Sequence, residues 1–409
     1  IEMDDYVRQV MKKKSANRAL KSTGKDAALV GQSIWNYIVE KYGKSSISNI
    51  LNYTRVIRNE QKSILITLGV PYKKLIADWE IFYSTMEQRV SQTYQPPADS
   101  LQFSPRHRSS LIYTTVKLSP DGRKIAYAEN DRGRFTVKVK SLENDQETTI
   151  LSGGNRVIHH DVDYRVPLLS WADANTLGVI VIRNGDYVFW LYDFNTRSKI
   201  PRELGQYSNI RSLNFNSNGR LAVISADVGG QNDLFLLSSR RDRTRRLTND
   251  IFDDLDPAFV PNSSSIVFSS NRTTDTLINT VRGHQNITEN YNLFMLNLDS
   301  GTTVGKRITN TLSKDFSPRA QDANNVYYLS DQRGIINLFR FNSQTGIYSQ
   351  LTNFSSSIKD YDLNFQSNML AMVMDKDLTE SIFLNSNFNF DRQIFTPSTR
   401  RKEIQQARV

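Results

Sequence analysis

Histidine and acidic residues gather at one place in the sequence, where they could bind a metal ion. His159-His160-Asp161 is followed by Asp163, and imidazole nitrogens and carboxylate oxygens are both ligands of divalent transition metals. Adjacent residues of a strand point to opposite faces, however, so two neighbouring histidines on a strand do not share one ion. No cysteine and no second histidine cluster occurs elsewhere. We therefore expect a solvated loop at this segment, with no metal ion and no other cofactor in the protein.

Covalent catalysis needs a nucleophile in a defined setting, and the sequence offers none. The chain contains no cysteine, which excludes thiol chemistry and disulfides. An α/β-hydrolase places its serine in Gly-x-Ser-x-Gly, and the nearest match, Gly31-Gln-Ser33-Ile-Trp35, breaks this pattern inside a predicted helix. A phosphate-binding Walker loop is also missing from the sequence. We expect this chain to carry no enzyme active site.

Basic residues outnumber acidic ones by 52 to 42, which raises the question of a nucleic-acid partner. The excess lies at the two ends: residues 1–95 hold 15 basic and 9 acidic residues, and residues 397–409 hold four and one. Proteins that bind single-stranded nucleic acid interleave aromatic residues with basic ones, whereas the runs Lys12-Lys13-Lys14 and Arg240-Arg241 contain none. We expect solvated faces, or contacts with acidic headgroups or proteins, and no nucleic-acid partner.

The N-terminal part of the sequence has the periodicity of helices. Apolar residues recur at three- and four-residue spacings over 25–42 and again over 71–92. A pair of prolines and several small polar residues then interrupt the pattern. We predict a helical region over 1–93 and a linker over 94–105. Because the chain begins Ile1-Glu2, without an initiator methionine, we expect it to be a mature product or an excised part of a longer protein.

A unit of strand, polar turn and strand recurs six times in the rest of the chain. The turn residues are Asp121, Asp173, Asn218, Asn262, Asp322 and Ser367, at intervals of 44 to 60 residues. Two further columns agree with this period, one of the type Asn-Leu-Phe (292–294, 337–339) and one of the type Leu-Thr-Asn (247–249, 351–353). Repeats of about 45 residues with four strands each are typical of propeller blades, which bury their faces against one another.

The predicted fold class is therefore α+β and multidomain, with a small all-α region followed by an all-β six-bladed propeller. We place the propeller over 106–396 and a basic tail over 397–409.

These columns resemble the TolB-type six-bladed propeller and, less closely, the propeller of prolyl-oligopeptidase relatives. The pattern comprises Leu-Thr, Asp-x-x-Pro, Ser-Pro-Asp-Gly, Ser-x-x-Arg and Asn-x-Phe. Its fullest matches are Leu247-Thr248, Asp254-x-x-Pro257, Asn292-Leu-Phe294, Asp315-x-x-Pro318, Ser330-x-x-Arg333, Asn337-Leu-Phe339 and Ser119-Pro-Asp-Gly122. The resemblance covers about 290 residues and implies the fold; propellers host enzymes, ligand binders and docking platforms alike.

The helical region resembles the C-terminal helices of peptidase MA-like (gluzincin) metallopeptidase domains, through Gly31-x-Ser-Ile-Trp-Asn-Tyr-Ile-Val-Glu-Lys-Tyr-Gly43 followed by Ile47-x-x-Ile-Leu51. In envelope proteins of bacteria, especially Bacteroidota, such a domain precedes a TolB-like propeller. The zinc and catalytic residues of that family lie upstream, in His-Glu-x-x-His and a later glutamate. This sequence contains no His-Glu-x-x-His, so no catalytic role carries over.

Four aspartates fall near the predicted start of an innermost strand: Asp163, Asp254, Asp315 and Asp360. A propeller would bring them to one mouth of its channel, as a ring that binds a cation or a basic segment of a partner. Alternatively, each carboxylate accepts local backbone N–H bonds and fixes a loop between blades. Ser100 and Thr276 each follow an aspartate and precede a leucine, as in the O-glycosylation acceptor of Bacteroidota envelope proteins.

Three functions follow from these patterns. The first is a non-catalytic protein-binding scaffold in the periplasm or at the cell surface, docking an outer-membrane or periplasmic complex and reaching the membrane through partners. The second is the C-terminal part of a zinc metallopeptidase whose propeller gates or presents substrate. The third, a sugar or peptidoglycan binder, ranks last because only Trp171 and Trp190 lie in the propeller, both on predicted strands.

Overall fold

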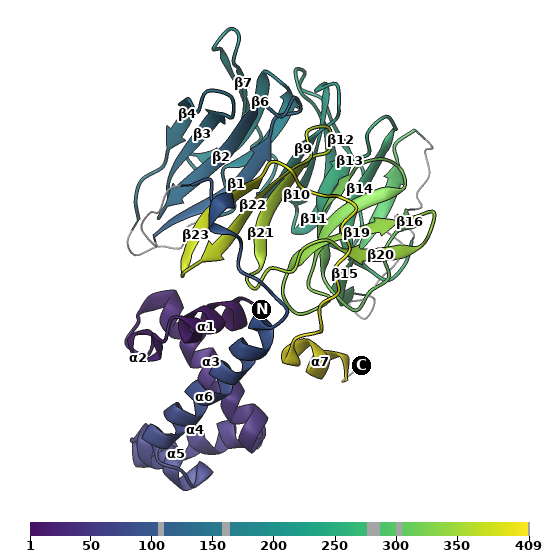
Figure 1. Ribbon diagram of the computed structural model, residues 1–409. Helices are drawn as coiled ribbons and strands as arrows, with labels where there is room; N and C mark the ends of the chain where they lie inside the picture. Colours follow the sequence, from purple (N-terminus) through teal and green to yellow (C-terminus); the bar gives the residue numbers. More distant parts are fainter. Residues whose placement is uncertain (105–109, 158–163, 276–286, 300–304, 408–409) are drawn as a thin grey trace.

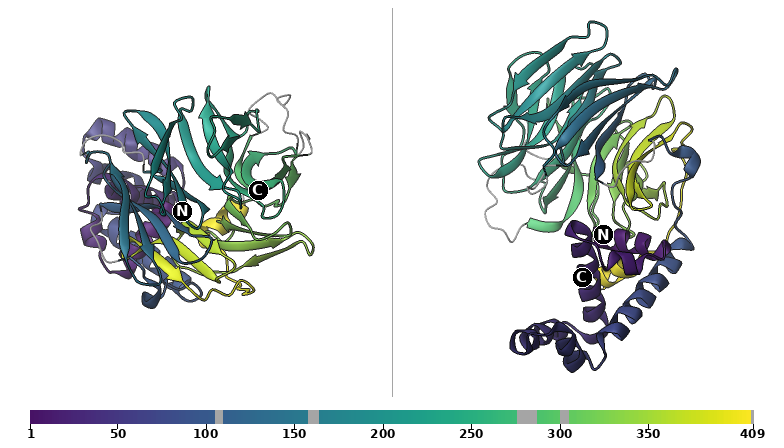
Figure 2. Two further views of the ribbon diagram at one scale, coloured as in Figure 1. Left: turned by 90° about the horizontal axis from the view of Figure 1, so that it is seen from above. Right: turned by 90° about the vertical axis from the view of Figure 1, so that its left-hand side faces the viewer.

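The computed structural model describes residues 1–104, 110–157, 164–275, 287–299 and 305–407. Helices occupy its N-terminal region, and antiparallel sheets form the rest of the molecule apart from one short C-terminal helix (Figure 1). Seen from above, the sheets are arranged around a common axis as the blades of a propeller (Figure 2). The predicted fold class is confirmed. No helix within the described ranges is long and apolar enough to cross a membrane.

The helical region packs around its longest helix, α6 (Tyr72–Ser91). Its helices are α1 (Glu2–Lys12), α2 (Ala16–Ala19), α3 (Gly24–Tyr42), α4 (Ser45–Ile57), α5 (Glu60–Leu68) and α6 (Tyr72–Ser91). Trp79 and Tyr83 of α6 are fully buried, and Trp79 Nε1 donates to Ser33 Oγ of α3 at 3.0 Å. The side chain of Asn59 accepts the Lys62 N–H at the start of α5, as expected for a good N-cap residue.

Five sheets of four strands each follow one another along the chain in the described residues. The first two contain β1 (Leu111–Leu118), β2 (Lys124–Asp131), β3 (Arg134–Ser141) and β4 (Glu147–Gly153), then β5 (Leu168–Asp173), β6 (Thr176–Arg183), β7 (Asp186–Asp193) and β8 (Lys199–Glu203). The third contains β9 (Asn209–Phe215), β10 (Leu221–Val228), β11 (Gln231–Ser238) and β12 (Thr244–Arg246). The next two contain β13 (Asp254–Phe259), β14 (Ser265–Arg272), β15 (Ile287–Asn297) and β16 (Lys306–Arg307), then β17 (Asp315–Ala320), β18 (Asn325–Ser330), β19 (Asn337–Asn342) and β20 (Ile347–Gln350).

Each predicted polar turn joins the first and second strands of its blade, as expected. Asp173 Oδ1 accepts the Asn175 N–H at 2.7 Å, and Asn218 Oδ1 accepts the Arg220 N–H at 3.0 Å. Asp322 does the same for Asn324 at 2.7 Å. These are Asx turns, which stabilise a reversal locally and therefore leave a readable signal in the sequence.

A hydrogen-bonded clamp explains why the Asn-Leu-Phe and Leu-Thr-Asn columns recur together. In the fifth blade, Thr352 Oγ1 donates to Asn337 Oδ1 at 2.8 Å and accepts the Leu338 N–H at 2.9 Å. The fourth blade repeats the clamp, with Thr309 Oγ1 accepting the Leu293 N–H at 2.9 Å. The clamp fixes the end of the outer strand to the third strand of the same blade.

The last sheet has three strands of its own and receives its outer edge from the segment before the propeller. Its strands are β21 (Ile358–Asn364), β22 (Met369–Lys376) and β23 (Thr379–Asn385). After the short 3₁₀ helix η1 (Asp99–Leu101), Gln102 forms an antiparallel bridge with Phe383, and the Phe103 N–H donates to the Ile382 carbonyl at 2.8 Å. Residues 102 and 103, which fall within the expected linker 94–105, thus help to close the propeller ring.

Helix α1 attaches the helical region to loops of the last two blades. The backbone N–H of Ser357 donates to Asp5 Oδ2 at 3.1 Å, and the Leu378 N–H donates to Gln9 Oε1 at 2.8 Å. Leu378 also packs into the apolar core of the helical region. The two regions therefore share both polar and apolar contacts.

The basic C-terminal segment, 397–409, forms a second attachment through α7 (Arg400–Gln406). Arg400 Nε lies 2.9 Å from Glu40 Oε2 of α3, and Arg401 forms an ion pair with Asp4 of α1. Lys402 is buried and its Nζ lies 3.1 Å from Asp331 Oδ1 of the propeller. Three consecutive cations thus bind two helices and one propeller loop, with α7 lying between both regions (Figure 1).

Candidate functional site

A partly open cavity of about 200 Å³ lies at the centre of the propeller. All six innermost strands, or the residues beside them, contribute to its wall. The charged side chains that line it are Lys117, Arg165, Arg211, Asp256, Arg319, Lys359 and Asp360. Cations are therefore the commoner charged groups on this wall.

The cations of the cavity wall are paired with acids. Lys117 Nζ lies 3.0 Å from Asp360 Oδ2, joining the first and last blades. Arg211 Nη2 lies 2.9 Å from Asp227, and Lys359 Nζ lies 2.8 Å from Asp375. These pairs balance most of the positive charge that the wall would otherwise present to a ligand.

Asp360 is held in its charged form at the middle of this network. Burial opposes its ionisation, but the Lys117 ammonium and the Val116 N–H outweigh burial and lower the pKa of Asp360. The Val116 N–H lies 2.9 Å from Asp360 Oδ2. A carboxylate bound in this way acts as a fixed anion rather than as a proton donor or acceptor at neutral pH.

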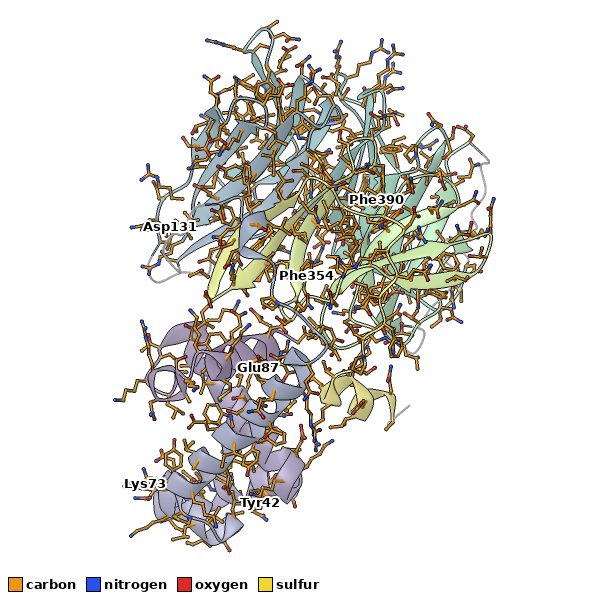
Figure 3. The ribbon with its side chains drawn as sticks, in the orientation of Figure 1. Tyr42, Lys73, Glu87, Asp131, Phe354 and Phe390 are labelled. Atoms are coloured by element: carbon orange, nitrogen blue, oxygen red, sulfur yellow. The ribbon has the colours of Figure 1, made fainter. Side chains whose placement is uncertain are left out.

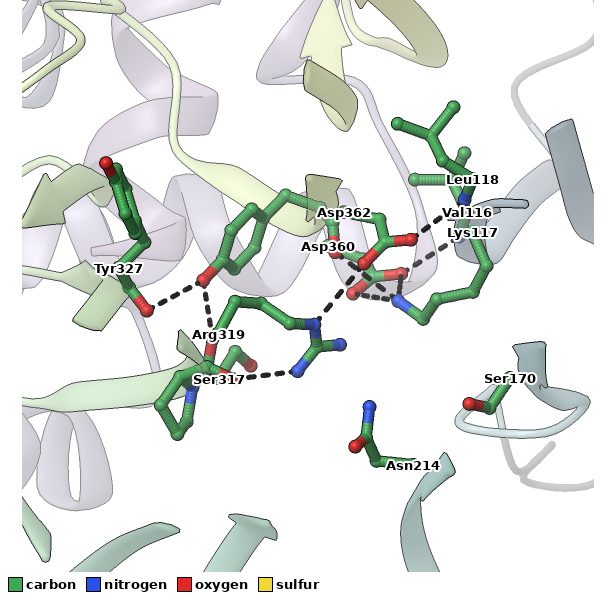
Figure 4. Close-up of polar contacts among 12 residues, drawn as sticks. Val116, Lys117, Leu118, Ser170, Asn214, Ser317, Arg319, Tyr327, Asp360 and Asp362 are labelled. Carbon is green, nitrogen blue, oxygen red and sulfur yellow. Dashed lines mark hydrogen bonds and ion pairs between the residues drawn. The ribbon is translucent and has the colours of Figure 1, made fainter. Parts of the chain in front are cut away.

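Polar contacts cross the blade boundaries around the channel. The N–H groups of Leu118, Phe215 and Phe259 donate to Asp362 (2.8 Å), Ser170 (3.2 Å) and Asn214 (3.1 Å) respectively, each in the preceding blade. Figure 4 shows the acceptors Asp362, Ser170 and Asn214 around the channel.

The remaining boundaries use other groups. Ser317 Oγ donates to Asp256 Oδ2 at 3.0 Å, between the fourth and fifth blades. Tyr361 OH donates to the Ser317 carbonyl at 2.7 Å, between the fifth and sixth, and Trp171 Nε1 donates to the Lys117 carbonyl at 3.2 Å, between the first and second. The innermost strands are thus joined by side chains as well as by apolar packing between blades.

The structure separates the aspartates that the sequence groups into a ring. Asp360 lines the cavity, as the third residue of β21 rather than at its start. Asp254 and Asp315, the first residues of β13 and β17, are fully buried and do not line it. Asp163 lies outside the described residues.

Asp254 and Asp315 instead make contacts within and between blades. Arg272 Nη2 donates to both Asp254 carboxylate oxygens at 2.6 Å, and Ser330 Oγ donates to Asp315 Oδ1 at 2.6 Å. The backbone carbonyl of each aspartate accepts a serine hydroxyl of the preceding blade, Ser225 at 2.7 Å and Ser269 at 2.6 Å. These contacts favour the interpretation in which the aspartates fix the loops and blades.

Arg272 forms a buried charge cluster with two aspartates and three aromatic rings. Its Nη1 lies 3.1 Å from Asp250 Oδ2, and its guanidinium lies 5.3 Å from the ring centre of Phe252. Burial raises the pKa of Asp250 to about 6, the Asp254 carboxylate adds to this, and Arg272 opposes it. Because all of these groups are buried, the cluster serves the interior of the fourth blade.

The other candidate residues give no shared site. Ser100 is exposed in η1, where a modifying enzyme could reach it, whereas Thr276, His159 and His160 lie outside the described residues. Within the described ranges, no three histidine or acidic side chains are grouped so that they could bind a metal ion.

Sequence reasoning missed the channel network, because Lys117, Arg319 and Asp362 belong to none of the repeated columns. One signal was available. Lys117 is the one charged residue of the innermost strand Leu111–Leu118, and a charge at such a position needs a partner in the folded protein.

No protein-family model matches the sequence, and no curated protein matches it. Among solved structures, the chain is similar to TolB from Acinetobacter baumannii, with 15% identity, 77% of this chain and 71% of that chain covered, and a TM-score of 0.46. It is also similar to the β-propeller domain of the Trilobed protease from Pyrococcus furiosus, with 14% identity, 69% of this chain and 84% of that chain covered, and a TM-score of 0.45. A third similar structure is oligogalacturonate lyase from Vibrio parahaemolyticus, with 11% identity, 72% of this chain and 97% of that chain covered, and a TM-score of 0.46. The assignment of six blades rests on the sheets themselves.

Proposed function

We propose that this chain is a non-catalytic scaffold of the bacterial cell envelope, whose propeller docks a protein complex in the periplasm or at the outer membrane. The observation that carries the proposal is the pairing of Lys117 and Arg319 with Asp360 and Asp362 across blade boundaries. These two ion pairs join the sixth blade to the first and to the fifth, which restrains the blades against one another. A rigid ring with solvent-exposed turns offers a broad binding surface without needing a pocket.

The docking surface that we propose is the end of the propeller opposite the helical region. Because adjacent strands are antiparallel, turns between first and second strands (259–265) and between third and fourth strands (342–347) lie at one end. The helical region contacts the other end, through the 350–358 connection and the 376–379 turn. The first set of turns is therefore free of the helical region.

The zinc-peptidase alternative has no specific observation in its favour. Its zinc ligands would lie upstream of this chain, and the helical region contributes Trp79, Ser33 and Tyr83 to a packed core. The experiment that follows distinguishes a zinc peptidase from a scaffold.

Affinity capture tests the proposal directly. The tagged chain is incubated with detergent-solubilised envelope of its own bacterium, and the recovered proteins are quantified by mass spectrometry. We expect one or a few envelope proteins in near-stoichiometric amount. Recovery of no stoichiometric partner would count against the scaffold, and zinc-dependent, chelator-sensitive peptide cleavage by the full-length protein would favour the peptidase.

Ser100 offers a separate check on the envelope location. It is exposed and follows Asp99 in η1, so we propose it as an O-glycosylation site. Intact-mass analysis of protein purified from its bacterium, compared with Ser100→Ala, reports the modification, and identical masses apart from the substitution would exclude it.

A further inference from the structure

The α4–α5 hairpin forms the end of the molecule farthest from the propeller (Figures 1 and 2). We call residues 44–74 the helical tip; Lys73, labelled in Figure 3, belongs to it. The tip exposes several large apolar side chains to solvent. These are Leu51 (56% exposed), Tyr53 (44%), Val56 (76%), Leu65 (47%) and Ile66 (54%).

The tip is also strongly basic. Its sequence contains six cations and one acid, Glu60. The cations, all exposed, are Lys44, Arg55, Arg58, Lys62, Lys73 and Lys74. No ion pair to any of them occurs in the part of the chain that the structure describes, whereas Arg400, Arg401 and Lys402 of α7 are all paired. The positive charge of the tip is therefore available to an external partner.

The apolar side chains do not share one flat face. Leu51 and Val56 are five positions apart on α4, which separates them by about 140° around the helix axis. Leu65 and Ile66 are adjacent on α5, about 100° apart. A rigid protein surface that meets the tip from one side would leave part of this apolar area uncovered, whereas a fluid interface closes around it.

We infer that the helical tip docks onto an anionic phospholipid surface, with its aliphatic side chains in the headgroup region and its cations on the lipid phosphates. Peripheral membrane binding strengthens with the apolar area buried among the headgroups and with attraction to anionic lipids, and anionic lipids attract such basic clusters. A second copy of the chain is a poor occupant, because two tips would bring like charges together. The inference is independent of the docking role of the propeller.

Vesicle cosedimentation of the whole chain tests this inference. The probes are phosphatidylcholine vesicles with and without about 30 mol% phosphatidylglycerol. We expect binding to the anionic vesicles only, weakened when NaCl is raised from about 50 to about 500 mM, because salt screens surface charge.

Two variants locate the surface. Lys62→Glu combined with Lys73→Glu and Lys74→Glu is expected to weaken vesicle binding by about tenfold or more. Leu65→Ser combined with Ile66→Ser is expected to weaken it without changing its salt dependence. All five side chains are exposed, so thermal unfolding should stay close to that of the parent chain.

A charge-matched control uses the other basic run, in the turn between β11 and β12. Arg240→Glu combined with Arg241→Glu and Arg243→Glu makes the same change in net charge on the propeller and should leave vesicle binding unaltered. The inference is overturned if the control weakens binding as much as the tip variants do, or if anionic vesicles are not bound at low salt. Self-association in sedimentation velocity that Leu65→Ser abolishes would assign the tip to a second copy and also overturn it.

Discussion

Lys117 on the first innermost strand forms an ion pair with Asp360 on the last, at 3.0 Å, across the junction where the propeller ring closes. The two residues are 243 positions apart in the sequence. Asp360 also accepts the Val116 N–H, so its carboxylate bonds with both the backbone and a side chain of the first blade. The contact therefore acts as a polar fastening between the two ends of the propeller.

Removing one partner of this pair should destabilise the propeller. We expect Lys117→Met to lower the free energy of unfolding by about 2 kcal/mol, because it leaves a buried carboxylate without its cation. Urea denaturation followed by tryptophan fluorescence measures the change. Lys140→Met is the control, since Lys140 pairs with Asp145 at the surface. Removing this ion pair should lower the free energy of unfolding by less than about 1 kcal/mol. Equal effects of the two substitutions would contradict the structural role of the channel pair.

Asp250 should make the protein less stable as the pH rises from about 4 to about 6. Burial raises its pKa from 3.8 to about 6. Between these values the folded protein binds more protons than the unfolded chain, so the free energy of unfolding falls with rising pH. Asp250→Asn should reduce this fall by about 2 kcal/mol. Denaturation midpoints across this pH range measure it.

Two comparisons make the pH prediction specific. Asp145→Asn removes an exposed carboxylate and is the control for the loss of one acidic side chain. Asp254→Asn replaces the carboxylate that accepts two hydrogen bonds from Arg272 Nη2. It should lower the free energy of unfolding at neutral pH by about 3 kcal/mol. An unchanged slope for Asp250→Asn would show that its pKa is not raised in the folded protein.

The Thr352–Asn337 clamp should contribute measurably to the fifth blade. Thr352→Val keeps the shape of the side chain but leaves the Asn337 Oδ1 and the Leu338 N–H with one partner fewer. We expect a loss of about 1 to 3 kcal/mol, together with faster hydrogen exchange of the Leu338 amide. Thr352→Ser retains the hydroxyl and should preserve most of the protection. Equal exchange rates in the two variants would exclude the clamp.

Helix α7 should hold the helical region against the propeller. Lys402 is buried between Asp331 and the Leu312 carbonyl, so Lys402→Met should loosen the attachment. Hydrogen exchange of residues 1–12 is then expected to rise, and small-angle scattering to show a larger maximum dimension. Arg400→Ala, at a more exposed ion pair, should have a smaller effect on both. No change in either measurement for Lys402→Met would mean that α1 alone fixes the two regions.

The features that can be predicted from the sequence are those stabilised by residues close together in the chain. The turn at Asp173 is stabilised within a few residues, so composition and spacing identify it. The columns around Thr352 and Asn337 repeat because the same clamp occurs in the fourth and fifth blades. This repetition allowed the propeller to be predicted from the sequence.

Other features depend on partners far away in the chain. The segment at Phe103 reads as a linker because its strand-like bonding comes from Ile382. Helix α7 is seven residues long and is fixed by ion pairs to Asp4, Glu40 and Asp331, so periodicity alone does not identify it. For the same reason, the sequence grouped Asp254 with Asp360, although only Asp360 lines the channel cavity.

The docking role of the propeller is tested most directly by crosslinking from single cysteines, since the chain contains no cysteine of its own. Ser264→Cys and Gln344→Cys place a photoactivatable label on exposed turns at the end opposite the helical region, and Arg183→Cys places it at the other end. In envelope extracts we predict the same protein crosslinked at near-stoichiometric yield from Ser264→Cys and Gln344→Cys, and little from Arg183→Cys. Equal, diffuse labelling from all three positions would contradict a docking scaffold.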